Sequence, residues 1–173
     1  MKVLVTGANG FVGKNLIAVL GEQDGVEVSV QLRSDLDSAL AEKLKGVDFV
    51  FHLAGVNRAD HENEFVEGNS VFTERLCEAI KREKRNIPII YTSSTQALDD
   101  NSYGRSKLAG EDALCELSES TANLVYIYRL PNVFGKWAKP NYNSFIATFC
   151  YNIISGDEIV INDPDASVRL VYI

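Results

Sequence analysis

The sequence predicts an α/β fold in which a doubly wound parallel sheet is covered by helices on both faces. Short apolar runs, typical of buried strands, alternate along the chain with segments whose apolar residues recur at helical spacing. A glycine-rich turn joins the first predicted strand to the first predicted helix within residues 2–20. Strand, glycine turn and helix in that order are the context of a dinucleotide-binding motif.

The first strand is predicted at residues 3–5 and the first helix at 11–20. Gly7 and Gly10 lie between this strand and this helix, and Gly13 lies in the first turn of the helix, so the three glycines are spaced three residues apart. We expect Gly7 to permit the tight turn, Gly10 to let the backbone approach a pyrophosphate, and Gly13 to let helix and strand pack closely. The helix N-terminus would then attract the phosphates. The alternative is a strand–helix turn that merely carries glycines.

The second predicted strand, residues 26–32, ends at Arg33. In a dinucleotide fold this end faces the adenosine ribose, where an acidic residue binds the 2′-hydroxyl of NAD and an Arg suits the 2′-phosphate of NADP. Arg33 therefore favours NADP, with NAD as the alternative because Asp35 is close by. A solvated Arg at the strand end is the functionally neutral interpretation.

The rest of the chain continues the alternation. A buried strand at 49–53 contains His52, which we interpret as a core histidine, and Gly55 follows at its carboxyl end, where ligands bind in open α/β sheets. Further helices are predicted at 36–44, 69–83, 103–117 and 144–154, and further strands at 87–91, 123–128, 159–161 and 168–173.

Three side chains suggest chemistry. Ser94 follows a predicted strand, and Tyr103 and Lys107 lie four residues apart on the next helix, hence on one face. A nearby ammonium favours the phenolate, so we expect Lys107 to lower the pKa of Tyr103 toward the range useful for acid–base catalysis. A serine hydroxyl can hold a reacting carbonyl oxygen.

Composition excludes several classes. The net charge of −7 argues against a nucleic-acid or anionic membrane partner. Three scattered cysteines without a paired histidine predict neither a disulfide framework nor a metal site, and they fit a reducing cytoplasm. The sequence shows no signal peptide and no apolar run long enough to span a membrane.

These motifs resemble the extended short-chain dehydrogenase/reductase family, also called the NAD-dependent epimerase/dehydratase family, which has a Rossmann-like fold. The matching segments are TGANGFVG at 6–13, HLAG at 52–55, Asn69 with Thr73 and Leu76, Ser93-Ser94, YGRSK at 103–107 and RLPNVFG at 129–135. Within that family, LAGVNR at 53–58 and NVFGKWAKPNYNS at 132–144 resemble the CapF-type capsular-polysaccharide reductases.

That resemblance implies NADPH-dependent reduction of the 4-keto group of a UDP-linked 6-deoxy-N-acetylamino sugar, with Tyr103 as the acid–base residue. Cofactor-binding residues implied by it are Gly7, Asn9, Gly10, Phe11, Val12, Gly13, Arg33, Leu53, Ala54, Gly55, Asn69, Tyr103, Lys107, Pro131, Asn132 and Val133. Substrate-binding residues implied by it are Arg58, Ser94, Thr95, Asn132, Lys136, Lys139 and Arg169. A homodimer is implied for the complete protein.

Two departures qualify the resemblance. Ser94 is followed by Thr95 and Gln96 rather than by the Asp-Glu pair of sugar 4,6-dehydratases, which disfavours loss of water. The family also continues into a substrate domain, so we expect a dinucleotide-binding domain at 1–135 and only the truncated start of a substrate domain at 136–173. A UDP-sugar 4-epimerase with tightly bound NAD and a non-catalytic NADP sensor stay open as alternatives.

Overall fold

The computed structural model of the chain describes residues 1–35 and 37–173. It divides into two compact units, Met1–Arg129 and Leu130–Ile173. This boundary lies earlier in the chain than the expected domain boundary after residue 135. Of the helix predicted at 36–44, Leu36 lies outside the described residues, and the helix itself spans Asp37–Leu44.

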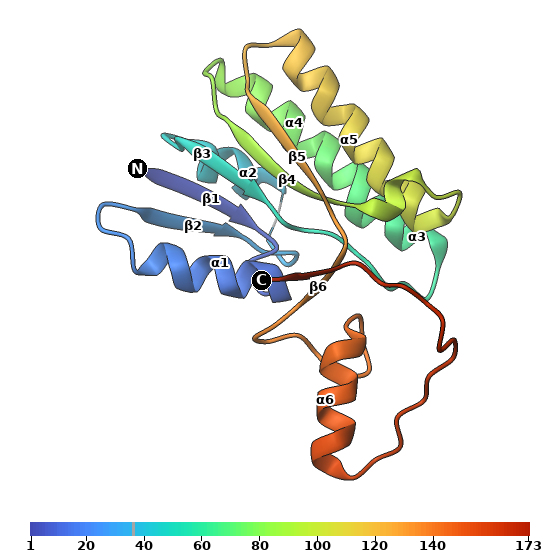
Figure 1. Ribbon diagram of the computed structural model, residues 1–173. Helices are drawn as coiled ribbons and strands as arrows, with labels where there is room; N and C mark the ends of the chain where they lie inside the picture. The colour runs from blue at the N-terminus through green and yellow to red at the C-terminus, as the bar shows by residue number, and fades with distance from the viewer. Residues whose placement is uncertain (36) are drawn as a thin grey trace. The chain divides into compact units, whose positions relative to one another are not determined.

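The first unit is built on a five-stranded sheet with the order β2-β1-β3-β4-β5 (Figure 1). The pairs β1–β2, β1–β3 and β3–β4 are parallel, which confirms the predicted sheet type. The strands are β1 (Lys2–Thr6), β2 (Glu27–Gln31), β3 (Phe49–His52), β4 (Ile89–Ser94) and β5 (Val125–Leu130).

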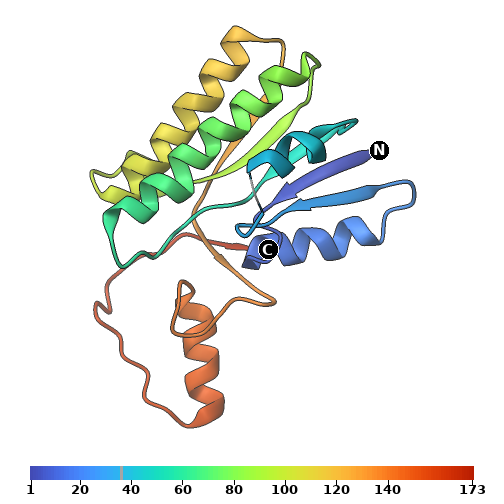
Figure 2. The same ribbon diagram turned by 180° about the vertical axis from the view of Figure 1, so that it is seen from behind.

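Helices connect these strands, and α4 and α5 lie side by side in the views of Figures 1 and 2. They are α1 (Phe11–Gly21), α2 (Asp37–Leu44), α3 (Glu62–Phe65), the π-helix η1 (Val66–Val71), α4 (Phe72–Glu83), the 3₁₀-helix η2 (Thr95–Leu98) and α5 (Ser102–Ser120). The sequence pattern missed α3 and η1, because it predicted a single helix that begins only at residue 69.

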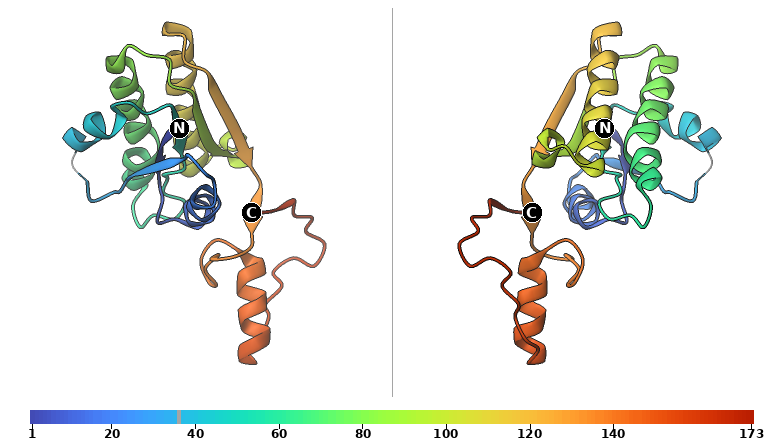
Figure 3. Two further views of the ribbon diagram at one scale, coloured as in Figure 1. Left: turned by 90° about the vertical axis from the view of Figure 1, so that its left-hand side faces the viewer. Right: turned by 90° about the vertical axis from the view of Figure 1, so that its right-hand side faces the viewer.

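Helices cover both faces of the sheet, as a doubly wound fold requires. Successive side chains of a strand point to opposite faces, and β1 follows this rule. Val3 and Val5 pack in a cluster with Leu20 of α1, whereas Leu4 packs with residues of α2, α4 and α5 such as Leu76. Figure 3 shows α1 on one side of the sheet and α4 and α5 on the other.

The turn between β1 and α1 depends on close backbone approach. Gly7 has φ 72°, and a Cβ there would lie 2.6 Å from the Ala54 amide nitrogen. A Cβ at Gly13 would lie 2.2 Å from the carbonyl oxygen of Gly7. Both contacts are shorter than any side chain tolerates, which confirms the packing roles expected for these two glycines.

Substituting Gly13 should therefore destabilise the first unit. We expect Gly13→Ala to lower the free energy of unfolding by about 1–3 kcal/mol, the range seen for overpacked sites. Gly21 on the same helix is the matched control, because an added Cβ there meets no atom within 4 Å. Gly21→Ala should raise stability by roughly 0.5–1 kcal/mol. Urea unfolding measures the change in the free energy of unfolding for each variant. Equal changes in the two variants would contradict the close contact at Gly13.

The second unit contains β6 (Asn132–Phe134), α6 (Phe145–Ser155) and β7 (Leu170–Tyr172), with β6 and β7 paired in parallel. Ser144 caps α6 by accepting a hydrogen bond from the Ala147 amide at 3.3 Å. The predicted strand at 159–161 is wrong, since these residues have no regular structure. Their apolar side chains Val160 and Ile161 are exposed.

Among the described residues, no helix combines the length and apolarity needed to cross a bilayer. In the same part of the chain, no cluster of three or more His, Cys, Asp or Glu residues is arranged to hold a metal ion. The three cysteines are free thiols, and burial raises the pKa of Cys77 to about 12. Such a thiol stays protonated and inert.

Candidate active site

The expected site residues of the first unit lie at the carboxyl ends of its strands. Gly7 follows β1, Ala54 and Gly55 follow β3, and Ser94 ends β4. The order of the strands reverses between β1 and β3, and ligands of open α/β sheets bind beside that point. The close approach of Gly7 to Ala54 shows that the two turns meet there.

The glycine turn places the start of α1 at this edge of the sheet. Gly10 is the N-cap residue, its amide donates to the Gly7 carbonyl at 2.9 Å, and no side chain caps the helix. The first turn of α1 also has no acidic residue. Such an end offers free N–H groups and partial positive charge, so it fits a pyrophosphate. Asn9 is exposed beside it, and Phe11 and Val12 are partly buried.

At the end of β2, Asp35 and Arg33 differ in their contacts. From the sequence, both are candidates for binding the adenosine ribose. Asp35 accepts a hydrogen bond from the Leu32 amide at 2.8 Å and pairs with Lys43. The bond from Lys43 and that from Leu32 hold the pKa of Asp35 below its ordinary value. The Asp35 carboxylate therefore closes its own turn, whereas Arg33 is exposed.

The loop after β3 is held by Asn69, which lies inside the π-helix. Its side chain accepts a hydrogen bond from the Val56 amide at 2.8 Å and donates to the Val56 carbonyl at 2.9 Å. It also donates to Ser106 of α5 at 2.9 Å. The widened turn of a π-helix is common at functional sites. Here it brings Asn69 to Gly55, whose added Cβ would lie 2.9 Å from the Asn69 oxygen.

His52 is a buried core histidine, as expected, and it joins the glycine turn to helix α4. Thr73 Oγ1 donates to the Asn69 carbonyl, so its oxygen is left to accept from His52 Nε2 at 2.8 Å. Nδ1 of His52 then accepts from Thr6 Oγ1 at 2.7 Å, and Thr6 accepts from the Ala54 amide at 3.1 Å. These partners assign the neutral Nε2–H tautomer.

This neutral histidine should make the fold sensitive to acid. Burial, assisted by the charge of Lys107, lowers the pKa of His52 from 6.5 to about 3. Between these values the unfolded chain binds a proton that the folded chain does not, so stability falls as the pH falls. His52 alone contributes about 1.4 kcal/mol per pH unit to that slope. Chemical unfolding across this range should show a shallower slope for His52→Gln and the parent slope for the exposed control His61→Gln.

The candidate catalytic group brings together Ser94, Tyr103 and Lys107. Ser94 lies close enough to Tyr103 to influence the pKa of its phenol, and Ser94 Oγ accepts a hydrogen bond from the Gln96 amide at 3.1 Å. Lys107 is only 3% exposed. Its Nζ lies 4.1 Å from the centre of the Tyr91 ring and 3.6 Å from the position of a Cβ at Gly55.

Burial determines the protonation of the two catalytic candidates. It lowers the pKa of Lys107 to about 7, against an opposing effect of Glu111. It raises the pKa of Tyr103, against the hydrogen bond from Ser94. The Tyr103 shift is opposite in direction to the lowering that the Tyr-x-x-x-Lys spacing predicts. The spacing argument is wrong in direction because it ignores the desolvation of the phenol and of the ammonium.

The other expected site residues are divided between the two units. Arg58 and Thr95 are exposed on the first unit. Lys136 lies in the second unit, with Nζ 4.4 Å from the centre of the Trp137 ring. The other expected residues of the second unit are Pro131, Asn132, Val133, Lys139 and Arg169. Their roles stay predictions.

Sequence reasoning missed several side chains that hold the site. Glu111 of α5 is buried and binds Arg129, and the Phe65 ring packs edge-on against Tyr103 at 5.8 Å. Glu111 was detectable, because it continues the spacing of Tyr103 and Lys107 along one face of α5. Phe65 was not, because nothing local places α3 beside α5.

The chain is similar in sequence and fold to known proteins. The model of the NAD dependent epimerase/dehydratase family matches residues 3–173. UDP-2-acetamido-2,6-beta-L-arabino-hexul-4-ose reductase of Pseudomonas aeruginosa is 56% identical over all of this chain and 46% of its own length. The chain therefore spans about half of that relative.

Solved structures give the same result. The capsular polysaccharide assembling protein CapF of Staphylococcus aureus superposes with a TM-score of 0.87 at 46% identity, over 99% of this chain and 47% of CapF. UDP-glucuronic acid 4-epimerase of Bacillus cereus, solved with UDP-glucuronic acid and NAD, has a TM-score of 0.86 at 19% identity over 99% of this chain and 69% of its own, a likeness of fold alone. With a family model that matches nearly its whole length, the chain belongs to the NAD dependent epimerase/dehydratase family.

Proposed function

We propose that the full-length protein reduces the 4-keto group of a UDP-linked 6-deoxy-N-acetylamino sugar with NADPH, in the synthesis of capsular polysaccharide or O-antigen precursors. The observation that carries the proposal is the 56% identity, along the whole chain, to a reductase of a UDP-linked hexul-4-ose. The neighbouring residues Ser94 and Tyr103, with the buried Lys107 one helical turn beyond Tyr103, support it, since carbonyl reduction needs an oxygen-binding group and a proton donor.

The first unit would hold the cofactor. The uncapped start of α1 and the narrow turn at Gly7 fit a pyrophosphate. Lys107, beside Gly55 and Asn69, would hold the nicotinamide ribose. When bound, NADPH supplies the hydride.

Ser94 and Tyr103 would bind the keto oxygen between them. Tyr103 then donates its proton to that oxygen as the carbonyl is reduced. The raised pKa of Tyr103 suits this direction of reaction, because the buried phenol keeps its proton at neutral pH. The neighbouring Lys107 would stabilise the phenolate that remains.

Arg33 would bind the 2′-phosphate that distinguishes NADPH from NADH. We expect Arg33→Gln to weaken NADPH binding about tenfold, since a charge-assisted hydrogen bond to phosphate is lost. NADH binding should be nearly unchanged. The exposed Arg82 at the end of α4 gives the control Arg82→Gln, which should bind both cofactors as the parent does. Fluorescence titration measures both affinities, and an equal loss for NADPH and NADH would contradict the role of Arg33.

We propose that Arg58 and Thr95 bind the substrate. The same role is proposed for Asn132, Lys136, Lys139 and Arg169. Pro131, Asn132 and Val133 would adjoin the nicotinamide. The proposed domains are residues 1–135 for the dinucleotide and 136–173 for the start of the substrate domain. A homodimer in the cytoplasm fits the resemblance, the net charge of −7 and the free thiols.

The assay is to mix full-length protein, NADPH and a UDP-linked 4-keto-6-deoxy-N-acetylamino sugar, and to follow NADPH absorbance and sugar products. The proposal expects NADPH to be consumed in equimolar amount with the sugar. A parallel reaction contains the corresponding 4-hydroxy UDP-sugar without NADPH. Interconversion of its 4-epimers, with no NADPH consumed by the keto sugar, would indicate an epimerase instead. Tight NADPH binding without turnover would indicate a sensor.

A further inference from the structure

A second buried charge lies beside the catalytic candidates. Glu111 is 5% exposed and lies on α5 one helical turn beyond Lys107, which itself lies one turn beyond Tyr103. A buried carboxylate is costly unless other groups satisfy it. The surroundings of Glu111 therefore reveal whether it is a structural ion pair alone or part of the site.

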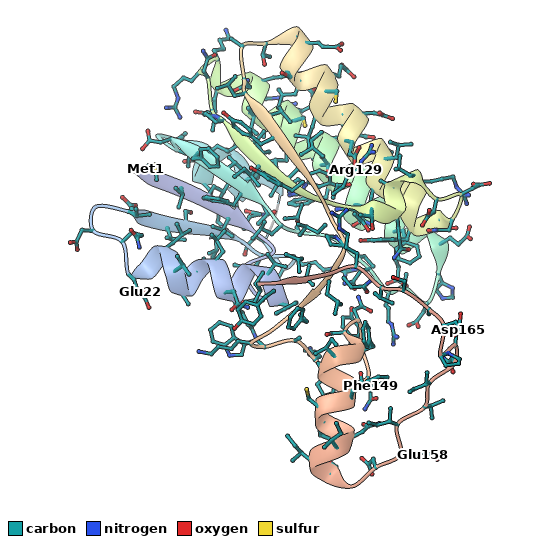
Figure 4. All side chains as sticks on the ribbon, in the orientation of Figure 1. Met1, Glu22, Arg129, Phe149, Glu158 and Asp165 are labelled. Carbon is teal, nitrogen blue, oxygen red and sulfur yellow. The ribbon has the colours of Figure 1, made fainter. Side chains whose placement is uncertain are left out.

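Two partners fix the Glu111 carboxylate. Arg129, labelled in Figure 4 toward the end of β5, donates from Nε to both oxygens, at 2.9 and 3.1 Å, and from Nη2 to Oε2 at 2.6 Å. Ser93, the neighbour of Ser94, donates to Oε1. Burial alone would raise the pKa of Glu111, but the bonds from Arg129 and Ser93 outweigh it and hold this pKa below its ordinary value. The carboxylate is thus ionised and held in one place.

Lys107 lies one helical turn before Glu111, on the same face of α5. Its titratable and charged surroundings are His52 on β3, Tyr91 on β4, Tyr103 and Glu111 on α5, and Arg129 on β5 behind Glu111. His52 is neutral and both phenols are protonated at neutral pH. Within this group, Glu111 is the negative charge that favours the ammonium form of Lys107.

We propose that Glu111 is a positioning residue whose clamped carboxylate sets how much of Lys107 is charged when the cofactor binds. The Lys107 side chain is buried beside the Tyr91 ring and Gly55, so bulk water does little to screen its charge from that of Glu111. Arg129 tempers the effect by neutralising part of the carboxylate charge. The inference rests on the role proposed for Lys107 in holding the ribose and stabilising the phenolate.

The test measures the Lys107 titration directly in full-length protein grown with ¹³C-labelled lysine. The ¹³Cε resonance of Lys107, assigned by its absence in Lys107→Arg, should titrate with a midpoint at about pH 7 in the parent. In Glu111→Gln the midpoint should move to lower pH by about one pH unit, because an opposite charge nearby is lost. Glu111→Asp keeps the charge and should restore most of the parent midpoint.

Asp112→Asn is the matched control, since Asp112 is the exposed neighbour of Glu111 on the same helix and loses the same charge. In this variant the Lys107 midpoint should stay at the parent value. The proposal is overturned if Glu111→Gln keeps the parent midpoint, or if Glu111→Asp shifts it as far as Glu111→Gln does, which is the behaviour of a purely structural residue. The titration needs no substrate, so absence of reduction by the parent would count against the proposed function alone.

Discussion

We expect Tyr103→Phe to lower the rate of sugar reduction by about 10²–10⁴-fold, the contribution typical of a positioned acid. The substitution removes the phenol hydroxyl and keeps the ring that packs against Phe65 at 5.8 Å. Cofactor affinity should therefore be unchanged. Steady-state kinetics and a fluorescence titration of NADPH measure the two quantities on the same preparation.

The control for this substitution is Tyr126→Phe, which removes a hydroxyl from an exposed tyrosine of β5. It should reduce the sugar at the parent rate. A Tyr103→Phe variant that retains most of the parent rate would show that another group donates the proton.

The second expected result concerns Lys107, whose removal should harm function and help stability. Lys107→Met should lower reduction at least 10²-fold and weaken cofactor binding, because the buried ammonium is lost. The same ammonium is costly to bury, since its pKa falls from 10.5 to about 7 on folding. At neutral pH the variant should unfold with a free energy higher by on the order of 2 kcal/mol or more.

The lowered pKa of Lys107 also determines how the stability difference between the parent and Lys107→Met changes with pH. Between pH 7 and 10.5 the unfolded parent binds a proton at Lys107 that the folded parent has lost, so the parent gains stability as the pH rises through this window. Lys107→Met lacks that gain, and its advantage should shrink toward pH 10.5. Lys84→Met, at the exposed residue that follows α4, is the control and should show the parent slope over this range. Equal slopes for all three proteins would contradict the buried, destabilising amine.

Local patterns were sufficient where one element decides the outcome. The apolar run of β1 and the glycines at 7 and 13 predicted a turn whose close contacts the structure contains. Helix α5 carried Tyr103 and Lys107 on one face for the same local reason. The doubly wound sheet followed from the alternation of strands and helices.

Long-range features could not be obtained in this way. The sequence pattern around η1 does not distinguish a π-helix from a regular α-helix. The widened turn accompanies the long-range contacts of Asn69 with the loop after β3 and with α5. The strand β6 exists because it pairs with β7, more than thirty residues later in the chain. The protonation of Tyr103 and Lys107 depends on burial, which the spacing of the two residues does not contain.

Transfer of deuterium from labelled NADPH tests the central claim most directly. Full-length protein would be incubated with NADPH that carries deuterium in place of both hydrogens at C4 of the nicotinamide, together with the UDP-linked 4-keto sugar. The product would be examined by mass spectrometry and NMR. The account predicts one deuterium bonded to C4 of the product sugar, and the loss of this product in Tyr103→Phe. A product without deuterium at C4, or equal labelling by Tyr103→Phe, would contradict it.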